Sequence, residues 1–423
     1  MRRIIIFSLF ALMLVSPVLA EDWSMFKKDI LHTGFTTDAA NPPLVLKWKS
    51  DIRYDTDSSP VVVNGVLYVG SNYGIHALDA GSGTSIWTTR TNGFVKSVPA
   101  VVDGILYVGA NDNRFYAIDT KDGAVKWIYK NATDGYQSSA AVVGGLAIAG
   151  SNDGSIYALD IRTGEPSWIG LTAQNVESSP AFSDGLAIVG NNNGIVIAFD
   201  TSTGKEKWRY QASNTEIKSS PAVANGKVFA GSNDGSIYAL TADSGRLKWK
   251  FSTPNNVEGS PSIKGNTLFA GSKDSTFYAI DTETGREIWN FKTAGFVDSS
   301  PAISNNVVYF GSRNNMIYAL DTNTGNLLWK NSTGTTDKDY ITSPAVSGNM
   351  LYAVTHSGIV YAYSSEAIAT PTPTVTTAAT PTIEKTTATP AASPTPTKPR
   401  ETPGFEYAVL ILVIAFLVRR KPG

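Results

Sequence analysis

The chain of 423 residues has no cysteine and only three histidines, His32, His76 and His356. Without cysteine it forms no disulfide bond and no cysteine-based metal site. The histidines do not have zinc-ligand spacing, so we expect no bound metal. Positive and negative charges are balanced, because the chain has 35 Lys and Arg residues and 36 Asp and Glu residues. A nucleic-acid partner is not expected, since it would require a basic patch.

Apolar runs stand at the two ends of the chain. Residues 4–15 are apolar, follow Arg2 and Arg3, and lead to the small-residue sequence Val18-Leu19-Ala20. This order is typical of a secretory signal peptide over residues 1–20, cleaved after Ala20. An uncleaved anchor is the less favoured alternative because the run is short.

Between the ends, an eleven-residue pattern returns seven times with a period of about 40 residues. Each copy begins with Ala, has Gly at the seventh place and ends with Trp. The copies cover residues 77–87, 117–127, 158–168, 198–208, 239–249, 279–289 and 319–329. Such a period indicates repeated supersecondary units rather than one irregular core.

One repeat predicts four short strands. In residues 219–252, four apolar or aromatic runs of about five residues are separated by turns such as Asn225-Gly226 and Asn233-Asp234-Gly235. Gly and Asn tolerate the positive φ of tight turns, and β-branched and aromatic residues favour strands. A four-stranded antiparallel sheet of this length is the unit of a β-propeller blade.

The recurring Ala-x-Asp-x-x-x-Gly-x-x-x-Trp resembles the PQQ-like, quinoprotein-type β-propeller repeat over residues 48–363. The resemblance implies that each Trp on an outer strand packs between its own Ala and the Gly turn of the neighbouring blade. The tryptophans expected to dock in this way are Trp48, Trp87, Trp127, Trp168, Trp208, Trp249, Trp289 and Trp329.

Eight repeats begin along the chain, but the last, residues 343–363, has no Trp strand. Residues 44–49 read like an outer strand with no strands before it. We therefore predict an all-β, eight-bladed propeller of four-stranded antiparallel blades over residues 43–364, whose last blade is closed by this N-terminal strand. Residues 21–42 form a lead-in, in which Trp23 is expected to pack on one face.

Quinone catalysis is not expected. Dehydrogenases of the resembling family carry insertions, a vicinal Cys pair, a Trp beneath the quinone and an acidic Ca²⁺ site. Here Cys is absent, every Trp except Trp23 is assigned to docking, and no blade has a large insertion. The motif acids, such as Asp79, are assigned to Asx turns because they recur in blades that could not share one site. We expect no cofactor and no catalytic residue.

One set of side chains varies while the frame around it is constant. It stands three places before the start of each innermost strand, which should place it around the mouth of the central channel. This candidate binding rim comprises Asp57, Lys96, Gln137, Glu177, Lys218, Glu258 and Asp298, with Ile341 in the eighth repeat. Variation on a fixed frame is typical of a binding face. The alternative is a solvated rim whose charges compensate one another.

The C-terminal part changes composition. Residues 365–402 are rich in Thr and Pro and predict a disordered, glycosylated stalk. Residues 403–423 begin with Pro403-Gly404-Phe405, continue with a short apolar run and end in basic residues. They resemble the PGF-CTERM sorting signal of archaeal surface proteins, which implies cleavage by an archaeosortase and a replacing lipid. A plain transmembrane anchor is the alternative. Asn131 and Asn331 begin N-glycosylation sequons after outer strands.

These features together predict a non-catalytic propeller that is secreted across the cytoplasmic membrane and anchored at the outer cell surface. Its expected partner is a cell-envelope protein or glycan, with roles such as surface-layer component, adhesin or receptor. One alternative is a scaffold for exported proteins, resembling the propeller lipoprotein of outer-membrane assembly. Another is a PQQ-dependent dehydrogenase.

Overall fold

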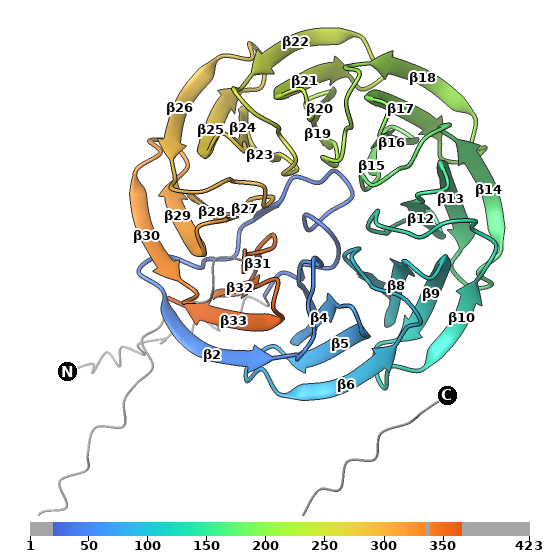
Figure 1. The fold of residues 1–423 in the computed structure, drawn as a ribbon, viewed down its shortest axis with the longest axis horizontal. Helices are drawn as coiled ribbons and strands as arrows, with labels where there is room; N and C mark the ends of the chain where they lie inside the picture. The colour runs from blue at the N-terminus through green and yellow to red at the C-terminus, as the bar shows by residue number, and fades with distance from the viewer. Residues whose placement is uncertain (1–19, 335–338, 366–423) are drawn as a thin grey trace, which may run out of the picture. The chain divides into compact units, whose positions relative to one another are not determined.

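The computed structural model describes residues 20–334 and 339–365, and in them all regular structure is β. The strands form eight sheets arranged as blades around a central axis (Figure 1). The predicted eight-bladed propeller is confirmed. The innermost strands of blades 1 to 8, three residues each, are β3 (Val61–Val63), β7 (Ala100–Val102), β11 (Ala141–Val143), β15 (Ala181–Ser183), β19 (Ala222–Ala224), β23 (Ser262–Lys264), β27 (Ala302–Ser304) and β31 (Ala345–Ser347).

The two middle strands of each blade are almost completely buried. The second strands are β4 (Val66–Gly70), β8 (Ile105–Ala110), β12 (Leu146–Gly150), β16 (Leu186–Gly190), β20 (Lys227–Gly231), β24 (Thr267–Gly271), β28 (Val307–Ser312) and β32 (Met350–Val354). The third strands are β5 (Gly74–Asp79), β9 (Arg114–Asp119), β13 (Ser155–Asp160), β17 (Ile195–Asp200), β21 (Ser236–Thr241), β25 (Thr276–Asp281), β29 (Met316–Asp321) and β33 (Ile359–Ser364). Their Val, Ile, Leu and aromatic side chains fill the space between blades, which are covered on both faces.

The outermost strands alternate between exposed and partly buried residues, as expected for sheets with one covered face. They are β6 (Ser85–Arg90), β10 (Val125–Tyr129), β14 (Pro166–Leu171), β18 (Glu206–Gln211), β22 (Leu247–Ser252), β26 (Glu287–Lys292), β30 (Leu327–Ser332) and β2 (Val45–Asp51). Asn131 follows β10 and is exposed, whereas Asn331 lies inside β30 and is half-buried, contrary to the placement expected after the strand.

The ring closes as the sequence predicts. Strand β2 pairs antiparallel with β33, with Trp48 opposite Ala362 and Lys49 opposite Tyr361. The first strand of the propeller therefore completes the last blade (Figure 1). This arrangement covers the edge that β33 would otherwise expose, and it ties the two ends of the repeat array together.

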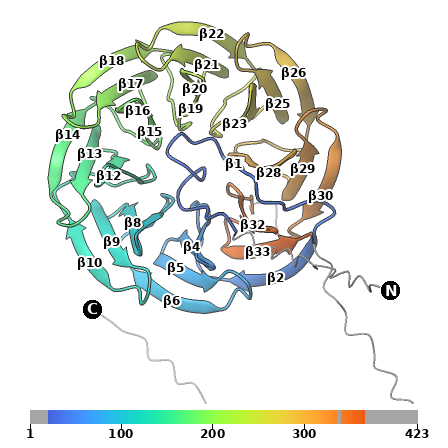
Figure 2. The ribbon, with the colours of Figure 1, turned by 180° about the vertical axis from the view of Figure 1, so that it is seen from behind.

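The lead-in crosses the centre of the ring in both views (Figures 1 and 2). Its carbonyl oxygens accept hydrogen bonds from innermost strands of several blades, for example Val101 N to Ser24 O and Val223 N to Leu31 O, both at 2.8 Å. Trp23 forms an antiparallel bridge with Val62, and β1 (Phe35–Thr36) pairs parallel with β27. The segment thus supplies partners to backbone groups that would otherwise face an open channel.

Two side chains of the lead-in are buried in the channel. Lys27, 3% exposed, donates from Nζ to Ser262 Oγ and, over 2.9 Å, to Pro301 O. His32, 1% exposed, contacts Pro221 O through Nδ1 at 2.8 Å. Burial lowers the pKa of Lys27 well below its ordinary value and lowers the pKa of His32 to about 4. Polar groups of the lead-in therefore contact the innermost segments of blades 5, 6 and 7.

The segment lies toward the end of the channel where the innermost strands finish. Asp22 accepts from Asn64 N, Thr36 O accepts from Asn305 N, and Asp38 accepts from Gly348 N, all in turns that follow innermost strands. The opposite end, where the innermost strands begin, is the mouth face. In the described part of the chain no helix could cross a membrane. Residues 1–19 of the predicted signal peptide, the Thr/Pro-rich stalk and the C-terminal motif lie outside the described residues.

Candidate ligand-binding face

The tryptophan frame fixes the positions of the blades. Each motif Trp lies opposite the Ala of its own blade, as Trp249 lies opposite Ala239, with a register shift beside the pair. Each of the eight indole N–H groups donates to a backbone oxygen of the neighbouring blade, over 2.7–3.1 Å. The acceptors, from Trp48 to Trp329, are Ala80, Thr120, Ile161, Thr201, Ala242, Thr282, Thr322 and Leu44.

The Gly of the motif leaves room for the ring. A Cβ added to Gly285 would lie 2.7 Å from Cδ2 of Trp249, and Gly285 has a φ of +70°. The motif acids stabilise the same turns, since Asp281 Oδ1 accepts from Thr284 N at 2.7 Å. These residues therefore build the frame, and they are separate from the mouth face.

The rim residues lie on the mouth face, and most of them form ion pairs. The pairs are Asp57 with Lys96 at 3.3 Å, Glu177 with Lys218 at 3.5 Å, Glu258 with Lys273 at 2.7 Å and Asp298 with Arg313 at 2.5 Å. Gln137 is half-buried and has no ion pair, and Ile341 is buried. Two of the four cations, Lys96 and Lys218, belong to the rim, and the other two, Lys273 and Arg313, lie outside it, so the four ion pairs together carry no net charge.

A depression of about 300 Å³ brings some of the rim residues together. Asp57, Lys218, Glu258, Asp298 and Ile341 contribute to its wall, together with residues outside the predicted set, among them Arg313 and Tyr340. Lys96, Gln137 and Glu177 do not line it. The rim is therefore not one uniform ring, and this depression draws its lining from blades 5 to 8 and from the segment that enters blade 1.

Asp57 is the centre of the junction between blade 8 and blade 1. Its carboxylate accepts a hydrogen bond from Tyr340 Oη and lies 3.0 Å from His356 Nδ1 and 3.3 Å from Lys96 Nζ. Burial alone would raise the pKa of Asp57, but Tyr340, Lys96 and His356 outweigh it and hold the pKa below its ordinary value. The group is therefore a carboxylate at neutral pH.

His356 is fixed by the same junction. Its Nδ1 lies near two acceptors, Asp57 Oδ1 and Thr56 O at 3.1 Å, so Nδ1 carries a proton. The ring stacks on Tyr340 with centroids 4.8 Å apart, and the guanidinium of Arg313 lies 4.1 Å from the Tyr340 centroid. This arrangement leaves Nε2 of His356 for a ligand, because the described residues give it no hydrogen-bond partner.

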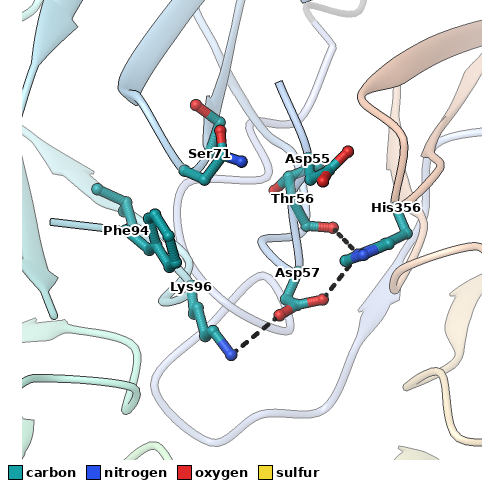
Figure 3. Close-up of a pocket in the computed structure, with 9 residues that line it drawn as sticks. Asp55, Thr56, Asp57, Ser71, Phe94, Lys96 and His356 are labelled. Carbon is teal, nitrogen blue, oxygen red and sulfur yellow. Dashed lines mark hydrogen bonds and ion pairs between the residues drawn. The ribbon is translucent and has the colours of Figure 1, made fainter. Parts of the chain in front are cut away.

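A second cavity, of about 270 Å³, opens beside Asp57 (Figure 3). Its lining includes Asp55, Asp57, Phe94, Lys96 and His356, which come from blade 8 and from the loops that enter blades 1 and 2. We call it the seam pocket. Phe94 is 52% exposed and gives the pocket an apolar surface. The pocket thus combines one apolar surface with fixed donors and acceptors.

The sequence pattern contains a signal for the residues that the rim prediction missed. The first residue of the turn between second and third strands is Asn in five blades, for example Asn152, but it is Lys273, Arg313 and His356 in blades 6, 7 and 8. These three side chains pair with the rim acids. The departure from Asn is visible in the sequence. Lys273 and Arg313 pair with the acid that precedes their own blade, whereas His356 meets Asp57 only because the ring is closed.

Comparison with known proteins agrees with this fold. The family model described as outer membrane protein assembly factor BamB matches residues 45–179, 152–260 and 255–391. The chain belongs to this family. A comparison with curated protein sequences finds no match.

Solved structures with the same fold include enzymes and proteins of other kinds. BamB from Moraxella catarrhalis is 18% identical, with 76% of this chain and 99% of that chain covered and a TM-score of 0.66. The quinohemoprotein alcohol dehydrogenase from Comamonas testosteroni is 16% identical, with 81% and 80% covered and a TM-score of 0.70. The computationally designed Ika8 protein is 20% identical, with 74% and 98% covered and a TM-score of 0.67. At these identities the likeness concerns the fold alone.

The mouth face does not fit a quinone cofactor. The eight docking tryptophans lie on outer strands, and Trp23 bridges Val62 in the lead-in, so none is available beneath a quinone. The acids of the rim are already paired with cations. Among the described residues, no group of three or more His, Asp or Glu could hold a metal ion. We therefore derive no reaction through a quinone.

Proposed function

We propose that this chain is a non-catalytic propeller that binds a cell-envelope partner through its mouth face while anchored at the outer cell surface. The seam pocket carries the proposal. It holds an exposed phenyl group next to a carboxylate, an ammonium and an imidazole whose positions are fixed by other contacts. Binding sites commonly combine one apolar surface with a few oriented polar groups.

The charge balance of the rim restricts the ligand. Paired charges give no net field that would attract a polyanion, so the proposal includes no nucleic-acid partner. A neutral ligand with hydroxyl or amide groups can exchange hydrogen bonds with Asp55, Lys96 and Nε2 of His356 while it covers Phe94. Envelope glycans and polar protein loops both have this chemistry.

Export and anchoring belong to the same proposal. The signal peptide would carry the propeller across the membrane, and the tail would hold it there, either as a membrane helix or through a lipid that replaces it after cleavage by an archaeosortase. Pro403, Gly404 and Phe405 are the proposed recognition motif. Glycans are proposed at Asn131 and, after local opening of β30, at Asn331.

A second candidate is a scaffold that assists the assembly of exported proteins. The family description favours it, because that description names an assembly factor. Such a scaffold would hold incompletely folded polypeptides rather than finished envelope components. The two candidates use the same face and differ in the state of the ligand.

The experiment uses the mature chain on a solid support, with detergent-solubilised envelope from the producing cells as the probe. We expect Phe94→Ala and His356→Ala to reduce the retained material at least tenfold. Phe296→Ala is the matched control, because Phe296 has the same loop position in blade 7 and is 46% exposed but does not line the seam pocket. Equal retention by all variants would overturn the proposal.

Treatment of the envelope before capture separates the candidates. Periodate, which oxidises vicinal diols, should abolish retention of a glycan, and protease should abolish retention of a protein. A denatured exported protein that competes better than its native form would favour the assembly scaffold. Native material that competes better would favour the surface receptor.

A further inference from the structure

Asp38 in the lead-in is a buried carboxylate without a cation. It is 9% exposed and accepts hydrogen bonds from two backbone N–H groups, Glu21 N at 2.9 Å and Gly348 N. Among the described residues, no Lys, Arg or His lies within ion-pair distance of it. A buried carboxylate normally has a cationic partner, because removal of its charge from water is costly. A positive charge beside Asp38 would therefore stabilise it further, and the described residues supply none.

The ammonium group beside this site is already engaged. Lys28 Nζ lies 2.6 Å from Glu21 Oε2, and the Glu21 carboxylate also accepts from Thr36 Oγ1 and Thr37 Oγ1. Lys28 and these hydroxyl groups lower the pKa of Glu21 to about 2. The site thus holds two carboxylates, Glu21 and Asp38, and one ammonium. One negative charge is uncompensated beside the backbone nitrogen of Glu21.

We propose that hydrolysis of the peptide bond between Ala20 and Glu21 completes this site. A signal endopeptidase would direct water to the carbonyl carbon of Ala20. The C–N bond breaks, Ala20 keeps the hydroxyl oxygen as a new carboxylate, and the nitrogen of Glu21 becomes an α-ammonium. No oxidant, reductant or cofactor is needed. The new cation arises at the atom that already lies 2.9 Å from Asp38 Oδ2.

The position of the site couples this cleavage to closure of the ring. Ser347 Oγ donates to Glu21 O at 2.9 Å, and Gly348 N donates to Asp38, so Glu21 and Asp38 are attached to the turn that follows β31 in blade 8. A Cβ on Gly348 would lie 3.2 Å from Cβ of Ala20, so Ala20 also packs against this turn. The free N-terminus would then fasten the lead-in to the last blade.

This inference does not depend on the ligand of the mouth face. An ion pair between Asp38 and the N-terminus differs from a hydrogen bond to a backbone N–H group, because the charge of the N-terminus contributes to stability. For an α-ammonium paired with a carboxylate, the pKa in the folded chain lies above the ordinary value of about 7.7–8.0. Its contribution to stability is then complete below about pH 7.7 and is lost as the pH rises through the folded-state value.

The test compares three forms of the chain that ends at Gly423, in detergent. One begins at Glu21, one retains Ala20, and one begins at Glu21 with an acetylated nitrogen. We expect the Glu21 form to melt about 2–4 °C higher than the other two at pH 6–7, and the difference to vanish above about pH 10. With Asp38→Asn, the three forms should have the same melting temperature. With Asp22→Asn, which changes an exposed neighbouring acid, the difference in melting temperature should remain.

Two measurements keep the proposal testable if Asp38→Asn does not fold. Titration of the α-amino group of the wild-type chain by NMR should give a pKa above the ordinary range. N-terminal sequencing of protein from the producing cells should begin at Glu21. An ordinary α-amino pKa, equal melting of the three forms, or a native chain that begins elsewhere would each overturn it.

Discussion

His356 of blade 8 donates from Nδ1 to Asp57, which precedes blade 1, over 3.0 Å. The contact spans the junction at which the last blade meets the first, and Tyr340 joins it by donating to the same carboxylate. Residues that are about 300 positions apart in the chain therefore build the wall of the seam pocket. The proposed ligand face thus includes contacts that join the last blade to the first.

This contact predicts a coupling between the two residues. Asp57→Ala and His356→Ala should each lower the free energy of unfolding. In the double variant this loss should be smaller than the sum of the two single losses by about 0.5–1 kcal/mol, a modest coupling because both groups are partly exposed. Lys205→Ala, a change of an exposed lysine in a turn of blade 4, should combine additively with either. Urea unfolding of the four-member cycle measures the coupling, and strict additivity would contradict the contact.

Trp249→Ala should destabilise the chain by about 3–5 kcal/mol, because it removes a large side chain from between two blades. Trp249→Phe should lower the free energy of unfolding less, but still by about 1 kcal/mol, because the hydrogen bond to Thr282 O disappears. Ile288→Ala, at a site 48% exposed on the outer strand of blade 6, is the control and should cost under about 0.5 kcal/mol. A loss below about 1 kcal/mol for Trp249→Ala, measured by denaturant unfolding, would contradict docking at this blade.

Removal of residues 21–51 should open the ring. The deletion takes away β2 and the lead-in, so β33 and the innermost strands lose their partners, and exposed strand edges associate. We expect aggregates by light scattering and a lower melting temperature. A chain that begins at Leu44 retains β2 and separates the contribution of the lead-in. A monomer without β2 that melts like the wild type is incompatible with this closure.

The buried histidine predicts a dependence of stability on pH. Burial lowers the pKa of His32 from 6.5 to about 4, so below pH 6.5 the unfolded chain binds a proton that the folded chain does not. Stability should therefore fall between pH 6.5 and about 4. His32→Gln should show a shallower decline in melting temperature over this window. His76, whose pKa burial also lowers to about 4, contributes to the slope that remains, as does Glu21, whose pKa is lowered to about 2. Identical slopes for variant and wild type would exclude His32 as a source.

Much of the fold could be predicted because the repeat is local. The spacing of Ala, Gly and Trp defines each blade, and an outer strand at residues 44–49 without a blade of its own predicts the closure by β2. The lead-in could not be placed in the same way, because it contains no repeat and its partners are spread over many blades around the ring. The burial of Lys27 and His32 therefore follows from the assembled channel and from no pattern near these residues.

The site was less predictable than the fold for a similar reason. Position within the repeat places Asp57 and Asp298 on the mouth face, but it does not show which side chains meet them. Arg313, Tyr340 and His356 come together only when blades 7, 8 and 1 are neighbours. The exposure of Phe94 likewise depends on the loop that holds it, while Val95, the next residue, is buried.

Hydrogen exchange of the mature chain with and without solubilised envelope tests the central claim most directly, because it maps the bound face whatever the identity of the ligand. We predict slower exchange in peptides that contain residues 54–59, 94–98 and 354–358, and no change in the outer strands β14 and β18. Phe94→Ala should remove this protection, and Phe296→Ala should retain it. Protection confined to the outer strands or to the turns at the opposite face, or protection that Phe94→Ala does not alter, would contradict the seam pocket as the binding site.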